Sequence, residues 1–256
     1  MSDSEQPPSI PAATVVVFRR SNGDGPPEIL MTVRHKAMTF AGGMAVFPGG
    51  RVDAADFDLA ARFPGDTEEV AHRIAAVREA LEETGLAVGI FERPTADQVR
   101  TARELLLKDG SLEPVLDAMG WTLDLDSVVP FARWHPKNER IPRIFDTRFY
   151  LADLGTGAVE LEIDATETTH LFWTTAQGAL EASDRGEISL IFPTRRNLER
   201  LATFQSFAEA RAQAEAIPVK SITPWMEDRD GEKWLLIPDD AGYPVPGEPL
   251  RSAARA

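Results

Sequence analysis

The segment from Arg78 to Leu86, Arg-Glu-Ala-Leu-Glu-Glu-Thr-Gly-Leu, constrains this chain more than any other stretch, because it places three carboxylates on one short piece that ends at a glycine. In an α-helix, residues three and four apart share a face, so Glu79 lies beside Glu82 and Glu83. Apolar residues fall on roughly the opposite side and form a stripe of Val70, Ile74, Val77 and Leu81. The spacing therefore predicts a helix that packs one face and gathers negative charge on the other.

Both ends of this helix are also marked in the sequence. Asp66 to Glu69 supply an acidic first turn and a candidate cap, which a helix N-terminus favours. Gly85 suits the left-handed residue that follows many helices.

Two explanations are open for the acidic face. Carboxylates about 6 Å apart repel by roughly 3 kcal/mol per pair at an effective dielectric near 20, but by under about 1 kcal/mol in bulk water. A solvated face therefore tolerates three of them, and charged runs often do no more than solvate a surface. The other explanation is a site for a divalent cation.

A glycine turn upstream, Phe47-Pro48-Gly49-Gly50-Arg51-Val52-Asp53, favours the cation, since such a turn brings backbone carbonyls close to a bound ion. Phe-Pro-Gly-Gly followed by Arg-Glu-x-x-Glu-Glu-x-Gly-Leu resembles the Nudix box of the Nudix hydrolases, which cleave nucleoside diphosphates linked to another group. The resemblance implies that Mg²⁺ or Mn²⁺ is bound by Glu79, Glu82 and Glu83, with the Gly49 carbonyl completing the shell. It also implies attack of an activated water on one phosphorus of a diphosphate.

The chain departs from the usual box in one respect. Gly50 and Arg78 lie 28 residues apart, double the usual interval, and residues 54–66 look like an insertion. The resemblance leaves open which acid replaces the usual first glutamate and pairs with Arg78. The candidates are Asp53, Asp56, Asp66 and Glu69.

Later segments narrow the resemblance to one Nudix branch, which contains the peroxisomal coenzyme A diphosphatase. These are Arg-Trp-x-x-Pro from Arg133, Arg-x-Phe-Asp-Thr-Arg-Phe from Arg143, and Pro-Thr-Arg-Arg-Asn-Leu from Pro193. The branch implies that coenzyme A or an acyl derivative is cleaved to 3′,5′-ADP and a 4′-phosphopantetheine product. ADP-ribose and NADH are the competing substrates, and a Nudix module that senses a nucleotide without hydrolysing it is the alternative of another class.

Several further residues are candidates for the chemistry. Glu82 and Glu83 are candidates for catalysis as well as for the metal, and Arg51, Arg133 and Arg143 are candidates for gripping phosphates, although arginines on strands usually pair with nearby acids. Glu167 is the candidate base that acts on the attacking water. A solvated loop glutamate explains Glu167 equally well.

Composition limits the class of protein. The net charge of −14 disfavours a broad surface for nucleic acid, and no apolar run approaches the ~20 residues that span a bilayer. The absence of cysteine fits a reducing compartment. We therefore expect a cytoplasmic enzyme with a small ligand.

The organisation expected is an α+β fold, the Nudix α/β/α sandwich with a mixed β-sheet and helical insertions. Residues 1–13 are expected to form a disordered tail and 14–214 the catalytic domain, with insertions at about 54–66 and 92–120. The domain is expected to include helices at 176–183 and 194–214. Residues 215–256 are expected to be extended and to pack on the domain or on a partner subunit in a homodimer.

Overall fold

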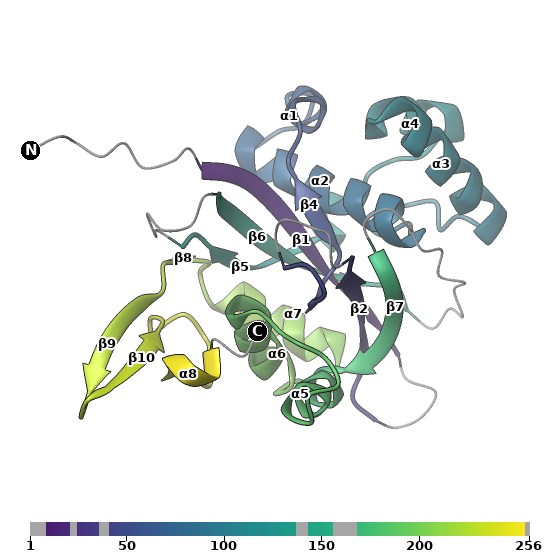
Figure 1. Ribbon diagram of the computed structural model, residues 1–256. Coiled ribbons are helices and arrows are strands. Elements are labelled where there is room, and N and C mark those ends of the chain that lie inside the picture. Colours follow the sequence, from purple (N-terminus) through teal and green to yellow (C-terminus); the bar gives the residue numbers. More distant parts are fainter. Residues whose placement is uncertain (1–8, 21–24, 36–40, 137–142, 156–167, 254–256) are drawn as a thin grey trace, which may run out of the picture.

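The computed structural model describes residues 9–20, 25–35, 41–136, 143–155 and 168–253. A mixed β-sheet lies between two layers of helices, with α1 to α4 on one face and α5 to α7 on the other (Figure 1). This arrangement confirms the predicted α+β sandwich. Among the described helices, none is both long and apolar enough to cross a bilayer.

The large sheet has the strand order β3-β2-β1-β6-β5-β8, with β4 paired to β1 and β7 paired to β2. Its two parallel pairs are β1 with β6 and β5 with β8, and its remaining pairs are antiparallel. The strands are β1 (Ser9–Arg19), β2 (Glu28–Arg34), β3 (Ala45–Val46), β4 (Gly49–Arg51), β5 (Val129–Trp134), β6 (Ile144–Asp153), β7 (Thr168–Thr175) and β8 (Ser221–Ile222).

Strand β1 shows how the sheet separates two cores. Val15 and Val17 point to the face that carries α2, whereas Val16 and Phe18 point to the opposite face, as the two-residue period of a strand requires. The first core packs against α1 (Ala54–Ala60), α2 (Thr67–Thr84), α3 (Ala96–Asp109) and α4 (Leu112–Met119). A short 3-10 helix (Leu125–Ser127) then leads into β5.

The opposite core packs against α5 (Ala176–Asp184), α6 (Phe192–Leu201) and α7 (Phe207–Ala216). The single helix predicted over 194–214 is therefore wrong, because the chain breaks between α6 and α7. Phe204 is buried at this break, and the Ser206 hydroxyl accepts the Glu209 amide at 3.2 Å to begin a new helix.

The N-terminal prediction is also wrong in part. Ser9 to Ala13 form the beginning of β1 and pair in parallel with Ile144 to Arg148 of β6, so a disordered tail does not reach residue 13. Ser9 and Pro11 are poor strand formers, and the neighbouring strands supply the pairing that the local sequence does not indicate. Residues 1–8 lie outside the described residues.

The C-terminal segment packs on the domain. It contributes β8 to the large sheet and then forms a three-stranded sheet that projects from the body (Figure 1), followed by a last helical turn. These elements are β9 (Trp225–Arg229), β10 (Glu232–Leu236), β11 (Gly247–Pro249) and α8 (Leu250–Ala253).

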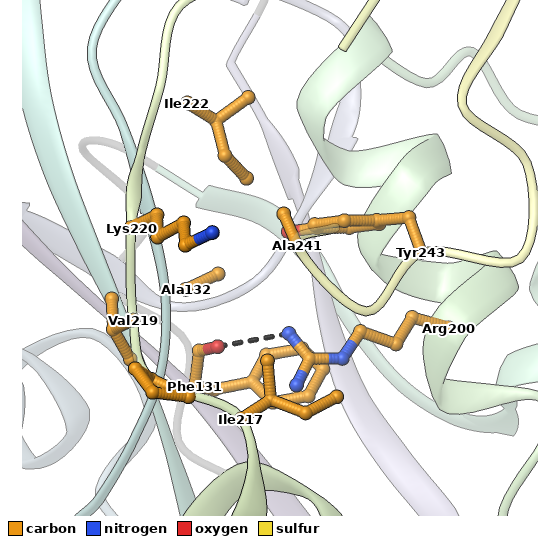
Figure 2. Close-up of a pocket in the computed structure, with 10 residues that line it drawn as sticks. Phe131, Ala132, Arg200, Ile217, Val219, Lys220, Ile222, Ala241 and Tyr243 are labelled. Carbon is orange, nitrogen blue, oxygen red and sulfur yellow. Dashed lines mark hydrogen bonds between the residues drawn. The ribbon is translucent and has the colours of Figure 1, made fainter. Parts of the chain in front are cut away.

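Arg200 of α6 ties this segment to the sheet. Its guanidinium donates to the Phe131 carbonyl at 2.9 Å and lies 3.9 Å from the centre of the Phe131 ring (Figure 2). Tyr243 covers the other side, with its ring centre 5.5 Å from the guanidinium. The cavity between these residues has a volume of about 10 Å³, which is room for about one water.

Candidate active site

Helix α2 forms as predicted and carries the acidic segment in its last two turns. The Asp66 carboxylate accepts the Glu68 amide at 3.0 Å at its beginning, and Gly85 ends it in the left-handed conformation with φ 68°. The first turn is anchored to the sheet, because Glu68 and Glu69 both pair with Arg148 of β6. The orientation of the helix across the sheet is thus fixed by charge as well as by packing.

Arg78 selects one of the four acids that the sequence left open. Its Nε and Nη2 donate to the two carboxylate oxygens of Asp56 at 3.0 Å each, and both side chains are almost completely buried. Asp53 lies farther away, at 3.6 Å from Nη2. Asp56, in helix α1 of the predicted insertion, is therefore the acid that pairs most closely with Arg78.

The remaining nitrogen of Arg78 donates to two of the candidate metal ligands. Nη1 donates to Glu79 Oε1 at 2.8 Å and to Glu82 Oε2 at 3.2 Å. Together with Asp56, three carboxylates share one guanidinium, which leaves a surplus of negative charge around Arg78. Their oxygens lie close together because they bond to one planar group.

The glycine turn completes the arrangement. The Gly49 amide donates to Glu83 Oε2 at 3.0 Å, so the third carboxylate is held against the turn. A Cβ on Gly50 would lie 2.4 Å from Glu79 Oε1, and a Cβ on Gly49, at φ 156°, would lie 2.3 Å from the Ala13 carbonyl. Gly49 requires glycine because the clash there is with backbone atoms, whereas a side chain at Gly50 would displace the Glu79 carboxylate.

Burial alters the acidity of this cluster. It raises the pKa of Glu79 to about 7, against the charge and hydrogen bond of Arg78, and the nearby charge of Glu82 raises it further. A buried carboxyl next to another acid is a favourable ligand for a cation, which removes the repulsion between them.

Three carboxylates and a backbone carbonyl are the hard oxygen donors that Mg²⁺ and Mn²⁺ prefer, and the residues present fit such an ion. Within the ranges that the structure describes, no group of three or more His, Cys, Asp or Glu side chains is already arranged around a metal position.

The predicted phosphate-binding residues differ in their surroundings. Arg51 follows the glycine turn and is exposed, while its carbonyl accepts Arg78 Nη2 at 2.8 Å. Arg133 donates two hydrogen bonds to Asp146, at 2.8 and 2.5 Å, as strand arginines often do. Arg143 is exposed just before β6, and Glu167 lies outside the described residues.

Arg103 contacts the site although sequence analysis did not single it out. It lies in α3 and donates from Nε to the Glu82 carbonyl at 2.9 Å. The available signal was an arginine flanked by Val99, Ala102 and Leu106 on the apolar side of a predicted helix.

The model of the NUDIX domain family matches residues 9–139. The chain belongs to the Nudix family of hydrolases. The match spans the glycine turn, the Arg78 cluster and helices α1 to α4, so the carboxylate site lies inside it.

A crystal structure of a Nudix hydrolase from Alicyclobacillus acidocaldarius is 28% identical, with a TM-score of 0.70 over 80% of this chain and 96% of that one. The Nudix domain of Shewanella oneidensis NrtR in complex with ADP ribose is 13% identical, with a TM-score of 0.42 over 78% of this chain and 90% of that one. No curated protein sequence matches the chain.

Proposed function

We propose that this Nudix hydrolase cleaves the diphosphate of coenzyme A or acyl-coenzyme A, with Mg²⁺ or Mn²⁺ held by Glu79, Glu82, Glu83 and the Gly49 carbonyl. The observation that carries the proposal is that all three glutamates are held in place: Glu79 and Glu82 accept hydrogen bonds from Arg78, and Glu83 accepts one from the Gly49 amide. A merely solvated acidic face would not need a buried arginine and a glycine turn to organise it.

A divalent cation, when bound, lowers the pKa of an attacking water and neutralises charge on the leaving phosphate. The chain's residues orient the reaction: Arg78 fixes the oxygens of Glu79 and Glu82, and the Gly49 amide fixes Glu83. The water oxygen bonds to phosphorus as the bridging P–O bond breaks, and a carboxylate accepts the proton. Glu167 is our first candidate for the acceptor, and Glu82 is the alternative, because its side chain is 36% exposed whereas that of Glu79 is 13% exposed.

Two features support coenzyme A as the substrate. The first is the sequence resemblance to one Nudix branch. The second is the helical insertion, which contacts the end of α2 through Arg103. Phe91 just before the insertion and Leu107 within it are exposed apolar side chains (61% and 52%). Exposed apolar side chains suit the carbon chain of a pantetheine arm, and the exposed Arg51 beside the glycine turn suits a phosphate.

The substrate is tested with a panel of coenzyme A, dephospho-coenzyme A, ADP-ribose and NADH, each with Mg²⁺ and with Mn²⁺. We expect coenzyme A to give 3′,5′-ADP and 4′-phosphopantetheine. Its kcat/KM should exceed that of dephospho-coenzyme A by a ratio that corresponds to about 1–3 kcal/mol of activation free energy, because a site built for the 3′-phosphate leaves its cations unpaired when that phosphate is absent. Comparison of Glu82→Gln with Glu167→Gln at saturating metal then identifies the proton acceptor.

A tenfold higher kcat/KM for ADP-ribose or NADH than for coenzyme A would show that coenzyme A is not the preferred substrate. The proposed diphosphatase activity would still stand. An absence of hydrolysis on the whole panel, in a protein that still binds the nucleotides, would instead support a module that senses a nucleotide.

A further inference from the structure

Helix α3 packs against the end of α2 that carries the acidic residues. Ala102 and Leu106 of α3 are buried in the same core as Ala80 and Leu81 of α2. Arg103 lies between these contacts and is 8% exposed. The insertion is therefore part of the wall behind the site.

Arg103 satisfies a backbone group at the end of α2 that the helix itself leaves without a partner. The last carbonyls of a helix have no acceptor role within it. The Leu81 carbonyl accepts the Gly85 amide at 3.0 Å, and the Glu82 carbonyl accepts Arg103 Nε at 2.9 Å. A cation at a helix C-terminus is also favoured by the helix dipole, and the shielded position of Arg103 reduces competition from water.

We propose that Arg103 is a positioning residue for the metal-binding carboxylates: it holds the Glu82 peptide and thereby fixes the last turn of α2, from which Glu82 and Glu83 project. The inference rests on the proposed function, because it requires that Glu82 and Glu83 bind the cation. It adds a role for the helical insertion, which supplies a donor that supports the acidic site.

The physical reason is that helix ends fray by a residue or two when they are not held. Fraying at this end would move Glu82 away from Arg78 and Glu83 away from the Gly49 amide, since both side chains leave from the same turn. Groups that support metal ligands from behind commonly change metal affinity by about 10- to 100-fold when they are removed.

The test measures Mn²⁺ binding to metal-free, full-length protein by electron paramagnetic resonance, together with the melting temperature without metal. Arg103→Met keeps an apolar stem but removes the donor and the charge, whereas Arg103→Lys keeps both a donor and a charge. The matched control is Arg100→Met on the same helix, where Arg100 bonds to Asp97 at the surface, at 2.8 Å.

We expect Arg103→Met to raise the Kd for Mn²⁺ by about tenfold, with Arg103→Lys restoring most of the affinity and Arg100→Met matching the wild type. A folded Arg103→Met protein with a lower melting temperature but wild-type Mn²⁺ affinity would overturn the inference, because Arg103 would then only pack α3. If Arg103→Met does not fold, Arg103→Gln is judged by the same two outcomes. A wild-type protein that binds no Mn²⁺ would overturn the proposed metal site itself, and this inference with it.

Discussion

Two buried arginines, on opposite faces of the sheet, have opposite surroundings. Arg78, on the α2 face, is bonded to three carboxylates from Asp56, Glu79 and Glu82. Arg200, on the α6 face, is bonded to neutral groups in its described contacts. Arg78 thus positions acidic side chains, whereas Arg200 connects two parts of the fold.

The surroundings of Arg200 account for its structural role. Its Nε donates to the Gln213 side-chain oxygen at 3.0 Å, its Nη1 donates to the Phe131 carbonyl, and the rings of Phe131 and Tyr243 lie against it (Figure 2). Burial lowers the pKa of Arg200. Hydrogen bonds and aromatic faces satisfy this cation without gathering surplus charge.

At Arg78 the acids outnumber the arginine, and part of their charge is left without compensation. Burial next to a second acid raises the pKa of Glu79, so the folded protein bears an electrostatic cost in this cluster. A bound divalent cation would remove that cost. The contrast teaches that a surplus of buried charge, rather than burial of charge as such, marks the functional face.

The largest expected effect is on catalysis. Glu83→Gln should lower kcat by ~10³ or more, equivalent to roughly 4 kcal/mol, while folding survives because the amide oxygen still accepts the Gly49 amide. Steady-state kinetics with saturating Mg²⁺ provide the measurement. Glu181→Gln, at an exposed position of α5 on the opposite face of the sheet, is the control and should keep its kcat; near wild-type turnover in folded Glu83→Gln would remove the metal-site account.

The next effect is on stability at Arg78. Asp56→Asn should lower the free energy of unfolding by about 3 kcal/mol, because it leaves a buried guanidinium without its bidentate partner. Urea unfolding followed by circular dichroism measures this change. An unchanged unfolding midpoint would mean that Asp56 does not hold Arg78 in solution.

A smaller effect depends on pH and lies on the α6 face. Burial raises the pKa of Glu199 to about 7, although Arg196 donates to its Oε1 at 2.8 Å, and its Oε2 is buried without a described partner. As pH rises, the carboxyl of Glu199 ionises in the unfolded chain before it ionises in the folded protein. The contribution of Glu199 to the free energy of unfolding is therefore full below about pH 4.5 and is lost as pH approaches and passes 7. The advantage of wild type over Glu199→Gln in unfolding free energy should therefore fall by about 2 kcal/mol from pH 5 to pH 8, and a constant difference would contradict the shift.

The smallest effect sharpens the comparison directly. Arg200→Met should lower the free energy of unfolding by about 1 to 2 kcal/mol, because the Phe131 carbonyl and the Gln213 oxygen lose their donor. Its kcat should stay within about twofold of wild type. A large loss of kcat at unchanged KM would show that the α6 face takes part in catalysis.

Much of the acidic site could be predicted from sequence because its signals are local. A helix with Glu79, Glu82 and Glu83 at helical spacing and a glycine at its end needs only the geometry of one element. The pairing of Asp56 with Arg78 could not be predicted, since it joins residues 22 apart through the packing of α1 on α2. Spacing along the chain gave four candidate acids and no means of choosing among them.

The strand at Ser9 and the break before Ser206 were missed for the same reason. Pairing with β6 overrides the weak strand propensity of Ser9 and Pro11. Apolar periodicity predicts one helix through residue 204, but Phe204 is buried at a break and Ser206 caps a new helix. The apolar neighbours of Arg103 indicate that it is buried, but its partner could not be predicted, because the acceptor is a backbone carbonyl and any residue has one.

The central claim is that the carboxylates gathered at Arg78 and the glycine turn bind a divalent cation. Calorimetric titration of Mn²⁺ into metal-free wild type, into the variant with Glu79, Glu82 and Glu83 all changed to Gln, and into Arg200→Met tests it most directly. We predict saturable binding to wild type and Arg200→Met, and loss of that binding in the triple variant. Equal binding to the folded triple variant and wild type would contradict the claim.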